Sequence, residues 1–380
     1  MRLTNNQQTF IGLVRAGLWE NCKKFNVDGL RFTEPVDWEK VYLLAEEQSV
    51  IGLVLAGIEH ANVKPPQELL LQWIGEVQML GQQNKAMNQF IAELFEKLSK
   101  AGVSALLVKG QGVAQSYEKP LWRCSGDIDL LMDGENYERA KELLVPIAEH
   151  VETENVGKKH LGLYIKDFLI ELHGAMPFEV SKRVDTVLDD VTEKAYTCHT
   201  NGTNDLQYVA IPKVDEHLMI VFTHFLNHFF IEGVGLRQVC DWCRLLWTYK
   251  DSLNYGLLET RIKRMGLMTE WQAFASLAVD VLGMPKEAMP MYDSRFKVKG
   301  ERILERIMKS GNMGHNNDLS YRAKYSGLTY KLVALWRRMK DFAGFTMLFP
   351  IDAPRFFVYY VLGRYDNRDK MPGVSGICLN

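Results

Sequence analysis

The chain has 380 residues, of which 47% are hydrophobic and 24% charged, and its formal net charge is −2. These values are ordinary for a soluble globular protein with room for two or three domains. No stretch reaches the roughly 18 apolar residues that a membrane span needs, and no signal-peptide pattern opens the chain. The six cysteines are scattered rather than arranged as a disulfide scaffold, so we expect a cytoplasmic protein.

Residues 1–100 are predicted to be helical. Apolar side chains recur at helical spacing near the start, and again after Asp37, which suits the N-cap of a long helix over DWEKVYLLAEEQSVIGLVLAGIEHA. A further long helix is predicted from about Glu68 to Ala101, with Gly102 as its C′ residue.

The periodicity changes from helical to extended after Gly102. VSALLVKG predicts a short strand ending at Lys109-Gly110, QGVAQSYEKP a short helix and DIDLLMD a second strand. Asn136 suits the N-cap of the next helix, and two short strands are predicted near 163–166 and 168–173. This order predicts an α+β core over residues 101–180.

The remainder, residues 181–380, is predicted to be a C-terminal helical region. Residues 181–212 look like a loop, and from Val214 onward successive helical patterns are punctuated by Gly and Pro. CDWC at Cys240 to Cys243 falls inside one of these patterns and reads as two packed thiols, because no second CxxC accompanies it.

A basic segment stands out within this region. Between Arg295 and Lys340, twelve Lys and Arg stand against three Asp and Glu, a net of +9, interleaved with aromatic residues such as Trp336. This composition is typical of a surface for nucleic acid or another polyanion. It is equally typical of helices whose solvated basic faces pack on an acidic remainder. Both interpretations stay open at this point.

Two carboxylates, Asp127 and Asp129, sit two residues apart within an apolar run. In a strand, such residues point to the same face, and Ile128 and Leu130 then point to a core. Neighbouring carboxylates repel each other and call for a cation or a shared proton. Hard oxygen ligands of this kind suit Mg²⁺.

A third carboxylate, Glu171, lies between apolar residues in a later predicted strand. A carboxylate there is costly unless it is paired or coordinated. Three carboxylates on adjacent strands could hold two Mg²⁺ ions about 3.5–4 Å apart. Asp127, Asp129 and Glu171 are therefore the predicted catalytic and metal-binding residues.

This pattern resembles the nucleotidyltransferases related to DNA polymerase β, and more closely the bacterial uncharacterised nucleotidyltransferase family of that superfamily. In that family a strand ends in Lys-Gly, an Arg precedes Gly-Asp-[IV]-Asp-[LI]-[LF], and a later strand ends in Asp-Leu-His. The resemblance covers about residues 37–250. The matching residues here are Lys109-Gly110, Arg123, Gly126-Asp127-Ile128-Asp129-Leu130-Leu131 and Glu171-Leu172-His173.

The resemblance implies a small polymerase-β-like core with a mixed sheet, between N- and C-terminal helical regions. It implies Mg²⁺, or Mn²⁺ in its place, and transfer of a nucleoside monophosphate from an NTP to a hydroxyl-bearing acceptor with release of pyrophosphate. A small molecule or a protein is the expected acceptor rather than a nucleic acid, given the pI of about 6.5. Glu171 is the expected base for that acceptor.

Roles for the surrounding residues follow from their chemistry. Backbone N–H groups after Gly110, at Gln111, suit phosphate oxygens, as would Lys109 unless it is merely solvated. Arg123 could clamp a phosphate through two hydrogen bonds or pair with Glu118 at the surface. Two residues complete the predicted nucleotide-binding set, namely Gly126 in the loop before the acids and His173, which shares a face with Glu171 and could orient the acceptor or the carboxylate.

The sequence leaves several alternatives open. The wider superfamily has a Gly-Ser turn where this chain has Lys109-Gly110-Gln111, and Glu171 stands where the close family prefers Asp. A catalytically inactive protein that keeps the fold as a nucleotide-binding or interaction module is one alternative. An enzyme acting on nucleic acid through residues 295–340 is another.

A second cluster comprises three histidines at spacings of seven and four, which place them on one helix face. They could pack, line the nucleotide pocket, or bind Zn²⁺ with a further ligand such as Asp241, unless Asp241 bridges to Arg237. The three are His217, His224 and His228.

Overall fold

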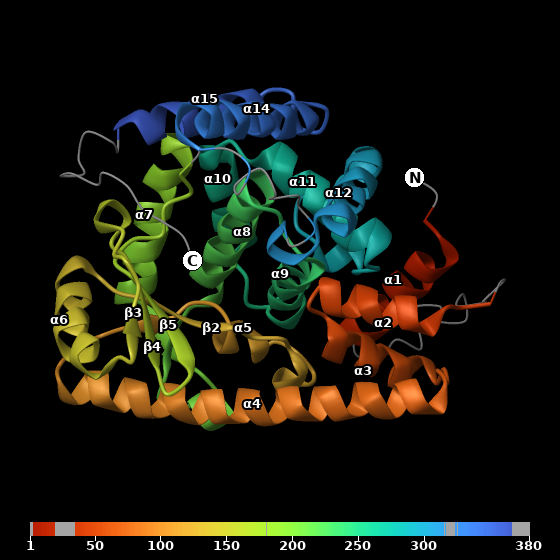
Figure 1. Cartoon of the computed structure of the whole chain (residues 1–380), viewed down its shortest axis with the longest axis horizontal. Helices are drawn as coiled ribbons and strands as arrows, with labels where there is room; N and C mark the ends of the chain where they lie inside the picture. The colour runs from red at the N-terminus through yellow and green to blue at the C-terminus, as the bar shows by residue number, and fades with distance from the viewer. Residues whose placement is uncertain are drawn as a thin grey trace.

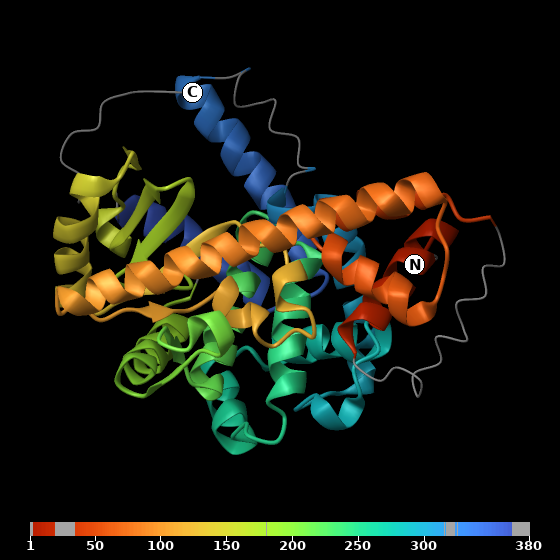
Figure 2. The ribbon, with the colours of Figure 1, turned by 90° about the horizontal axis from the view of Figure 1, so that it is seen from below.

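The computed structural model describes residues 3–19, 35–179, 181–314, 316, 324 and 326–366. Helices dominate these ranges, and one mixed sheet lies towards one end of the molecule (Figure 1). The long helix α4 runs along one whole side, and α14 and α15 lie on the opposite side (Figures 1 and 2). This architecture agrees with the predicted α+β class.

The N-terminal helices confirm most of the expected elements. They are α1 (Asn5–Leu18), α2 (Trp38–Glu47), α3 (Ile51–Ala61) and α4 (Gln67–Lys100). The Asp37 side chain accepts a hydrogen bond from the backbone N–H of Lys40, as an N-cap should. The single helix predicted after Asp37 is instead two, because Ser49 adopts a left-handed conformation with φ 54°.

The sheet has the strand order β1-β2-β5-β4-β3. Its strands are β1 (Leu106–Leu107), β2 (Asp127–Leu131), β3 (His150–Val151), β4 (His160–Ile165) and β5 (Phe168–His173). β2 and β5 run parallel, whereas the other neighbours are antiparallel. A tight turn at Lys166-Asp167, where both residues have positive φ, connects β4 to β5 and fixes their register.

The two faces of the sheet have opposite character. On one face, alternate residues of β2 and β5 such as Ile128, Leu130 and Leu172 are buried against the second half of α4. The register places Asp129 beside Glu171 across β2 and β5, so these carboxylates share the opposite face. The apolar layer under α4 thus holds the strands that carry the acids in place.

Two predicted features around the sheet are wrong. The helix α6 (Gly134–Leu144) begins earlier than predicted, because Asp133 rather than Asn136 caps it. The expected loop after residue 180 contains α7 (Lys182–Thr197), capped by Ser181. The apolar residues of α7 recur at helical spacing among many charged residues and are buried at Val184, Val187, Leu188, Val191 and Ala195.

Short elements connect the sheet to the helical region. These are α5 (Gln111–Ala114), β6 (His199–Asn201) and β7 (Ala210–Pro212). The C-terminal helices are α8 (Val214–Ile231), α9 (Leu236–Thr248), α10 (Tyr255–Met265), α11 (Met268–Ser276), α12 (Lys297–Ser310), α14 (Gly327–Thr346) and α15 (Asp352–Asp366). They share one hydrophobic core with α1 to α3. None of the helices in the described ranges could span a membrane.

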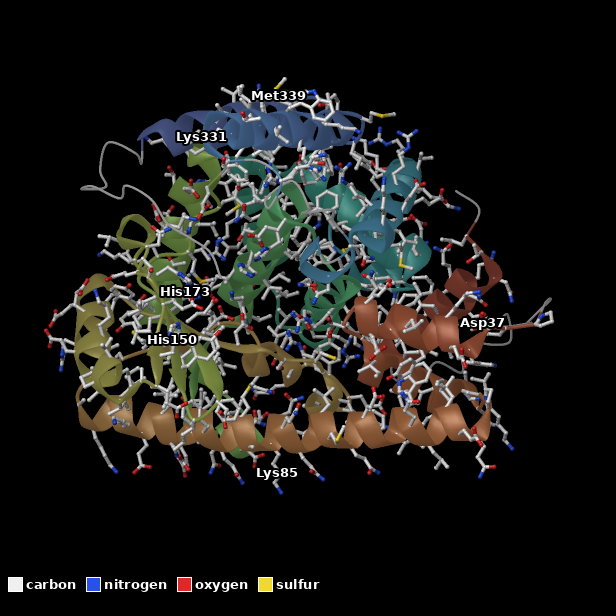
Figure 3. All side chains as sticks on the ribbon, viewed as in Figure 1. Asp37, Lys85, His150, His173, Lys331 and Met339 are labelled. Atoms are coloured by element: carbon white, nitrogen blue, oxygen red, sulfur yellow. The ribbon has the colours of Figure 1, made fainter. Side chains whose placement is uncertain are left out.

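The basic segment falls on α12, α14 and the chain between them, of which Tyr321, Arg322 and Tyr325 lie outside the described residues. Lys331 and Met339 lie on the outer side of α14, away from His173 (Figure 3). Some basic side chains are engaged in packing. The Arg306 guanidinium lies 3.6 Å from the centre of the Phe345 ring, and Arg306 donates to the backbone oxygen of Asp341.

Candidate active site

The structure brings the three predicted carboxylates together. Asp127 and Asp129 lie on β2, and Glu171 lies on the neighbouring strand β5, directly beside Asp129. One carboxylate oxygen from each of the three lies within 4.8 Å of the others. Parallel pairing of β2 with β5 is the cause, because it aligns the acid-bearing faces of strands whose paired residues are 42 apart in the chain, as are Asp129 and Glu171.

Asp129 is the most deeply buried of the three acids, with 1% of its side chain exposed. Its Oδ1 accepts hydrogen bonds from Lys109 Nζ at 2.5 Å and from His173 Nε2 at 2.9 Å. Burial alone would raise the pKa of Asp129, but the charges of Lys109 and His173 outweigh it and the pKa is lowered. Asp129 is therefore ionised at neutral pH.

Asp127 is less well compensated. The repulsion of Asp129, followed by burial, raises the pKa of Asp127 despite the attraction of Lys109. Within the described ranges no side chain is ion-paired with Asp127. The three carboxylates therefore carry more negative charge than their neighbours neutralise. Their oxygens fit a hard divalent cation such as Mg²⁺ or Mn²⁺.

Glu171 lies between two imidazoles. Its Oε2 is 3.4 Å from both His160 Nε2 and His173 Nε2. Burial opposes ionisation, but the neighbouring imidazoles of His160 and His173 and the charge of Lys109 lower the pKa of Glu171 well below its usual range. Conversely, burial disfavours the charged form of His173, yet Asp129 and Glu171 together raise the pKa of this imidazole.

Lys109 connects the acids to helix α8. Its Nζ lies 3.2 Å from His224 Nε2, which in turn lies 3.1 Å from His228 Nε2. His228 Nδ1 continues the series to Glu232 Oε2 at 3.0 Å. Burial, Lys109 and His228 lower the pKa of His224 well below its ordinary value, so His224 is a neutral acceptor for the Lys109 ammonium.

The three histidines of α8 do not act as one cluster. His217 Nε2 donates to the backbone oxygen of Val108 at 2.8 Å, whereas His224 and His228 contact each other. Asp241, the suggested fourth ligand for Zn²⁺, is engaged elsewhere. The candidate metal-binding groups formed by described residues do not include any of these three histidines.

Arg123 lies in a buried ion pair. Its Nε and Nη2 each donate to Asp241 at 2.7 Å, and Tyr117 Oη donates to the same carboxylate at 2.8 Å. Arg123 Nη1 donates to Ser125 Oγ at 2.9 Å, so the described contacts of the guanidinium lie within the protein, and its contact with phosphate stays a prediction. The alternative pairing with Glu118 is wrong, because Glu118 lies beside His60.

Arg237 does not bridge to Asp241 either. Its Nη1 donates to the backbone oxygen of Cys124 at 2.8 Å. The positive charge of Arg237 favours ionised Asp127, but the repulsion of Asp129 is larger and the pKa of Asp127 is raised overall. Cys240 and Cys243 are buried free thiols, as predicted for packed side chains.

The turn after β1 positions Lys109. Gly110 has φ +51°, and a Cβ there would lie 3.1 Å from the backbone oxygen of Asp127, so a side chain would be strained. The buried Gln111 side chain donates to Asn84 Oδ1 at 2.8 Å, and the contact of its backbone N–H with phosphate stays a prediction. At Gly126, by contrast, a Cβ would meet nothing within 4 Å.

A cavity of about 390 Å³ opens beside the acids. Glu171 and His173 line it from the sheet, and His224 and His228 line it from α8. Its wall also contains apolar side chains of α7 and α8, including Leu188 and Ile220. A molecule in this cavity would lie next to Glu171 and His173.

Sequence reasoning missed His160 as part of this site. The strand that carries it was predicted to begin near residue 163, whereas β4 begins at His160 and pairs that residue with His173. The tight turn at Lys166-Asp167 was recognisable in the sequence. Counting back from it, in antiparallel register, would have placed His160 opposite His173.

A family model described as an uncharacterised nucleotidyltransferase matches residues 34–283, which is more than half of the chain. No curated protein and no solved structure matches the chain significantly. The matched range contains all three carboxylates, Lys109 and the paired Arg123 and Asp241. The chain belongs to the uncharacterised nucleotidyltransferase family.

Proposed function

We propose that this protein transfers a nucleoside monophosphate from an NTP to a hydroxyl-bearing acceptor and releases pyrophosphate, with Mg²⁺ or Mn²⁺ as the required ion. The observation that supports this most strongly is the convergence of Asp127, Asp129 and Glu171 on one face of the sheet. We also propose that residues 101–180 form a polymerase-β-like catalytic core.

Asp127, Asp129 and Glu171 would hold the divalent cation. When bound, it would neutralise charge on the triphosphate and polarise the reacting phosphate. Lys109 now neutralises Asp129. We propose that Lys109 exchanges this partner for a phosphate oxygen when the nucleotide binds, because His224 already supports the ammonium from the other side.

Glu171 is the proposed partner of the acceptor hydroxyl. Its lowered pKa keeps it ionised at neutral pH, so it can accept a hydrogen bond from that hydroxyl and orient it towards the phosphate. His173 contacts both Glu171 and Asp129, which makes it a positioning residue for the two carboxylates.

The cavity favours a small molecule or a protein side chain as the acceptor. Its wall combines polar groups such as Asn155 and Asn227 with apolar residues, and it lies between the sheet, α7 and α8. The basic face of α14 lies on the outside of the molecule, away from His173 (Figure 3). A nucleic acid gripped by α14 is therefore the weaker alternative.

The test is pyrophosphate release from each of the four NTPs with Mg²⁺, using a cell extract as the source of acceptors. Asp127→Asn and Asp129→Asn should each lower turnover at least about a thousandfold, or ~4 kcal/mol in activation free energy. Asp251→Asn is the matched control, because this side chain is 92% exposed. Unchanged turnover in the double variant would reject the proposal, and nucleotide binding without pyrophosphate release would favour an inactive binding module.

A further inference from the structure

A second group of potential ligands lies beside the carboxylate cluster and shares Glu171 with it. It consists of His160, Glu171 and His173, whose ligand atoms all lie within 4.8 Å of one another. Unlike the first group it offers two imidazole nitrogens and one carboxylate oxygen. This donor set disfavours Mg²⁺, which takes oxygen ligands, and suits Zn²⁺ and its neighbours in the first transition series.

The spacing of these atoms leaves room for one shared ion, and His173 Nε2 would exchange its hydrogen bond to Asp129 Oδ1 for that ion. Both imidazole Nε2 atoms lie 3.4 Å from Glu171 Oε2, beyond the usual N–H···O range of about 2.7–3.2 Å. Two ligands that are each about 2.1 Å from one ion, at a tetrahedral angle, lie about 3.4 Å apart. The separations of the two Nε2 atoms from Glu171 Oε2 match that edge length.

The pairing of β4 with β5 brings the two imidazoles together. His160 and His173 are directly opposite each other on the antiparallel strands β4 and β5, and their ring centres are 4.9 Å apart. Glu171 is two residues from His173 and therefore points to the same face. The three ligands thus come from two neighbouring rigid strands rather than from loops.

The site has an open side. His160, Glu171 and His173 all line the 390 Å³ cavity. Three protein ligands leave one tetrahedral position free, which is typical of catalytic rather than structural zinc sites. That position would face the contents of the cavity.

We propose that His160, His173 and Glu171 bind a divalent transition-metal ion of the Zn²⁺ type, distinct from the ion held by the carboxylates, with Glu171 shared between the two sites. Its open position contacts a water or a hydroxyl group in the cavity. Activation of the acceptor by this ion rests on the proposed nucleotidyl transfer. The existence of the binding site does not depend on that function.

The experiment titrates Co²⁺ alone, as a spectroscopic substitute for Zn²⁺, into the metal-stripped full-length protein. We expect the intense visible absorption of tetrahedral Co²⁺ at one equivalent, unaffected by excess Mg²⁺. His160→Gln and His173→Gln should each weaken Co²⁺ binding at least about tenfold, and the double variant should lose the absorption. Asp127→Asn should retain it.

His150→Gln is the matched control, because His150 is an exposed histidine on the edge strand β3 of the same sheet (Figure 3). Circular dichroism verifies folding. If the double variant does not fold, His160→Gln carries the test, because the His160 side chain is 30% exposed. Absence of tetrahedral absorption in the native protein, its persistence in the histidine variants, or displacement of Co²⁺ by equimolar Mg²⁺ would overturn the proposal.

Failure of this proposal and failure of the proposed function can be told apart. Tetrahedral Co²⁺ absorption without NTP turnover supports the histidine site and counts against nucleotidyl transfer. Mg²⁺-dependent pyrophosphate release without any Co²⁺ absorption supports nucleotidyl transfer and counts against the histidine site.

Discussion

Two buried ion pairs in this protein have similar composition but different surroundings. Arg123 and Asp241 join through two parallel hydrogen bonds, with Tyr117 as a third donor to the same carboxylate. Lys109 and Asp129 join through one contact, and each has a further partner, His224 for the lysine and His173 for the aspartate.

The difference lies in whether the charges are fully matched. The planar guanidinium satisfies both oxygens of Asp241, so this pair is complete and holds the loop before β2 against α9. The Lys109 ammonium instead faces three carboxylates, of which Asp127 has a raised pKa. A pair with surplus negative charge beside it can accept a cation, whereas a complete pair cannot. We therefore interpret the first pair as structural and the second as part of the site.

The largest effect is expected at the structural pair. Arg123→Met leaves the buried Asp241 carboxylate without its cation, which should lower the free energy of unfolding by about 3–5 kcal/mol. Urea denaturation measures this. Arg264→Met removes the cation of the exposed pair with Asp190 and should cost less than about 1 kcal/mol. Equal losses in the two variants would show that the Arg123 pair is not structural.

The next largest effect is expected at His217. Its Nε2 donates to the backbone oxygen of Val108, next to Lys109, and the negative charge of Asp241 also acts on this imidazole. Burial lowers the pKa of His217 to about 4, against about 6.5 in the unfolded chain. The unfolded state therefore binds more protons between these values, so stability is complete above pH 6.5 and falls as the pH drops towards 4.

Protonation of this histidine in the unfolded state should lower the free energy of unfolding by about 3 kcal/mol over that pH interval. Urea midpoints at pH 7 and pH 4.5 test it. His217→Gln should be less sensitive to acid than the native protein, whereas His199→Gln, an exposed histidine on β6, should behave as the native protein does. An identical acid response in His217→Gln would contradict the assignment.

Lys109→Met tests the second pair. We expect turnover to fall about a hundredfold, or ~2.7 kcal/mol in activation free energy, because the nucleotide loses its proposed phosphate ligand. Its loss of stability should be smaller than that of Arg123→Met, because His173 still donates to Asp129. Lys85→Met, on the outer side of α4, is the control (Figure 3). A variant that is fully active but strongly destabilised would make Lys109 structural as well.

The smallest effect is expected for exposed charges. The double variant Lys331→Ala, Lys340→Ala removes two exposed cations from α14, and turnover should stay within about twofold of the native value. The dependence of RNA or DNA binding on salt provides the second measurement. A steep slope that falls in this variant would favour the nucleic-acid alternative over a cavity-bound acceptor.

Much of the fold was predictable because its local signals are strong. The helical periodicity of α4 and α8, the caps at Asp37 and Gly102, and the alternation of acids with Ile128 and Leu130 each depend on a few neighbouring residues. α7 was missed because its buried residues are sparse among charged ones. The helix after Asp37 is divided at Ser49, which has a positive φ, and no local sequence pattern indicates that conformation.

The composition of the site was partly predictable and its pairing was not. Two acids at strand spacing, a third acid in a later strand and a Lys-Gly turn are features that the sequence itself displays. Which arginine pairs with which acid depends on packing between distant elements. Arg123 and Asp241 are 118 residues apart, and only the contact of the loop before β2 with α9 brings them together.

The sequence by itself determined that Asp127 and Asp129 share one strand face, because the side-chain period of a strand is two. It also placed these two acids and Glu171 in a family pattern that covers most of the chain. The tertiary structure decided that Glu171 lies beside Asp129, because that depends on the parallel register of β2 and β5. The antiparallel register of β4 and β5 likewise places His160 opposite His173 at the site. Strand pairing, which the local sequence does not specify, brings these residues together.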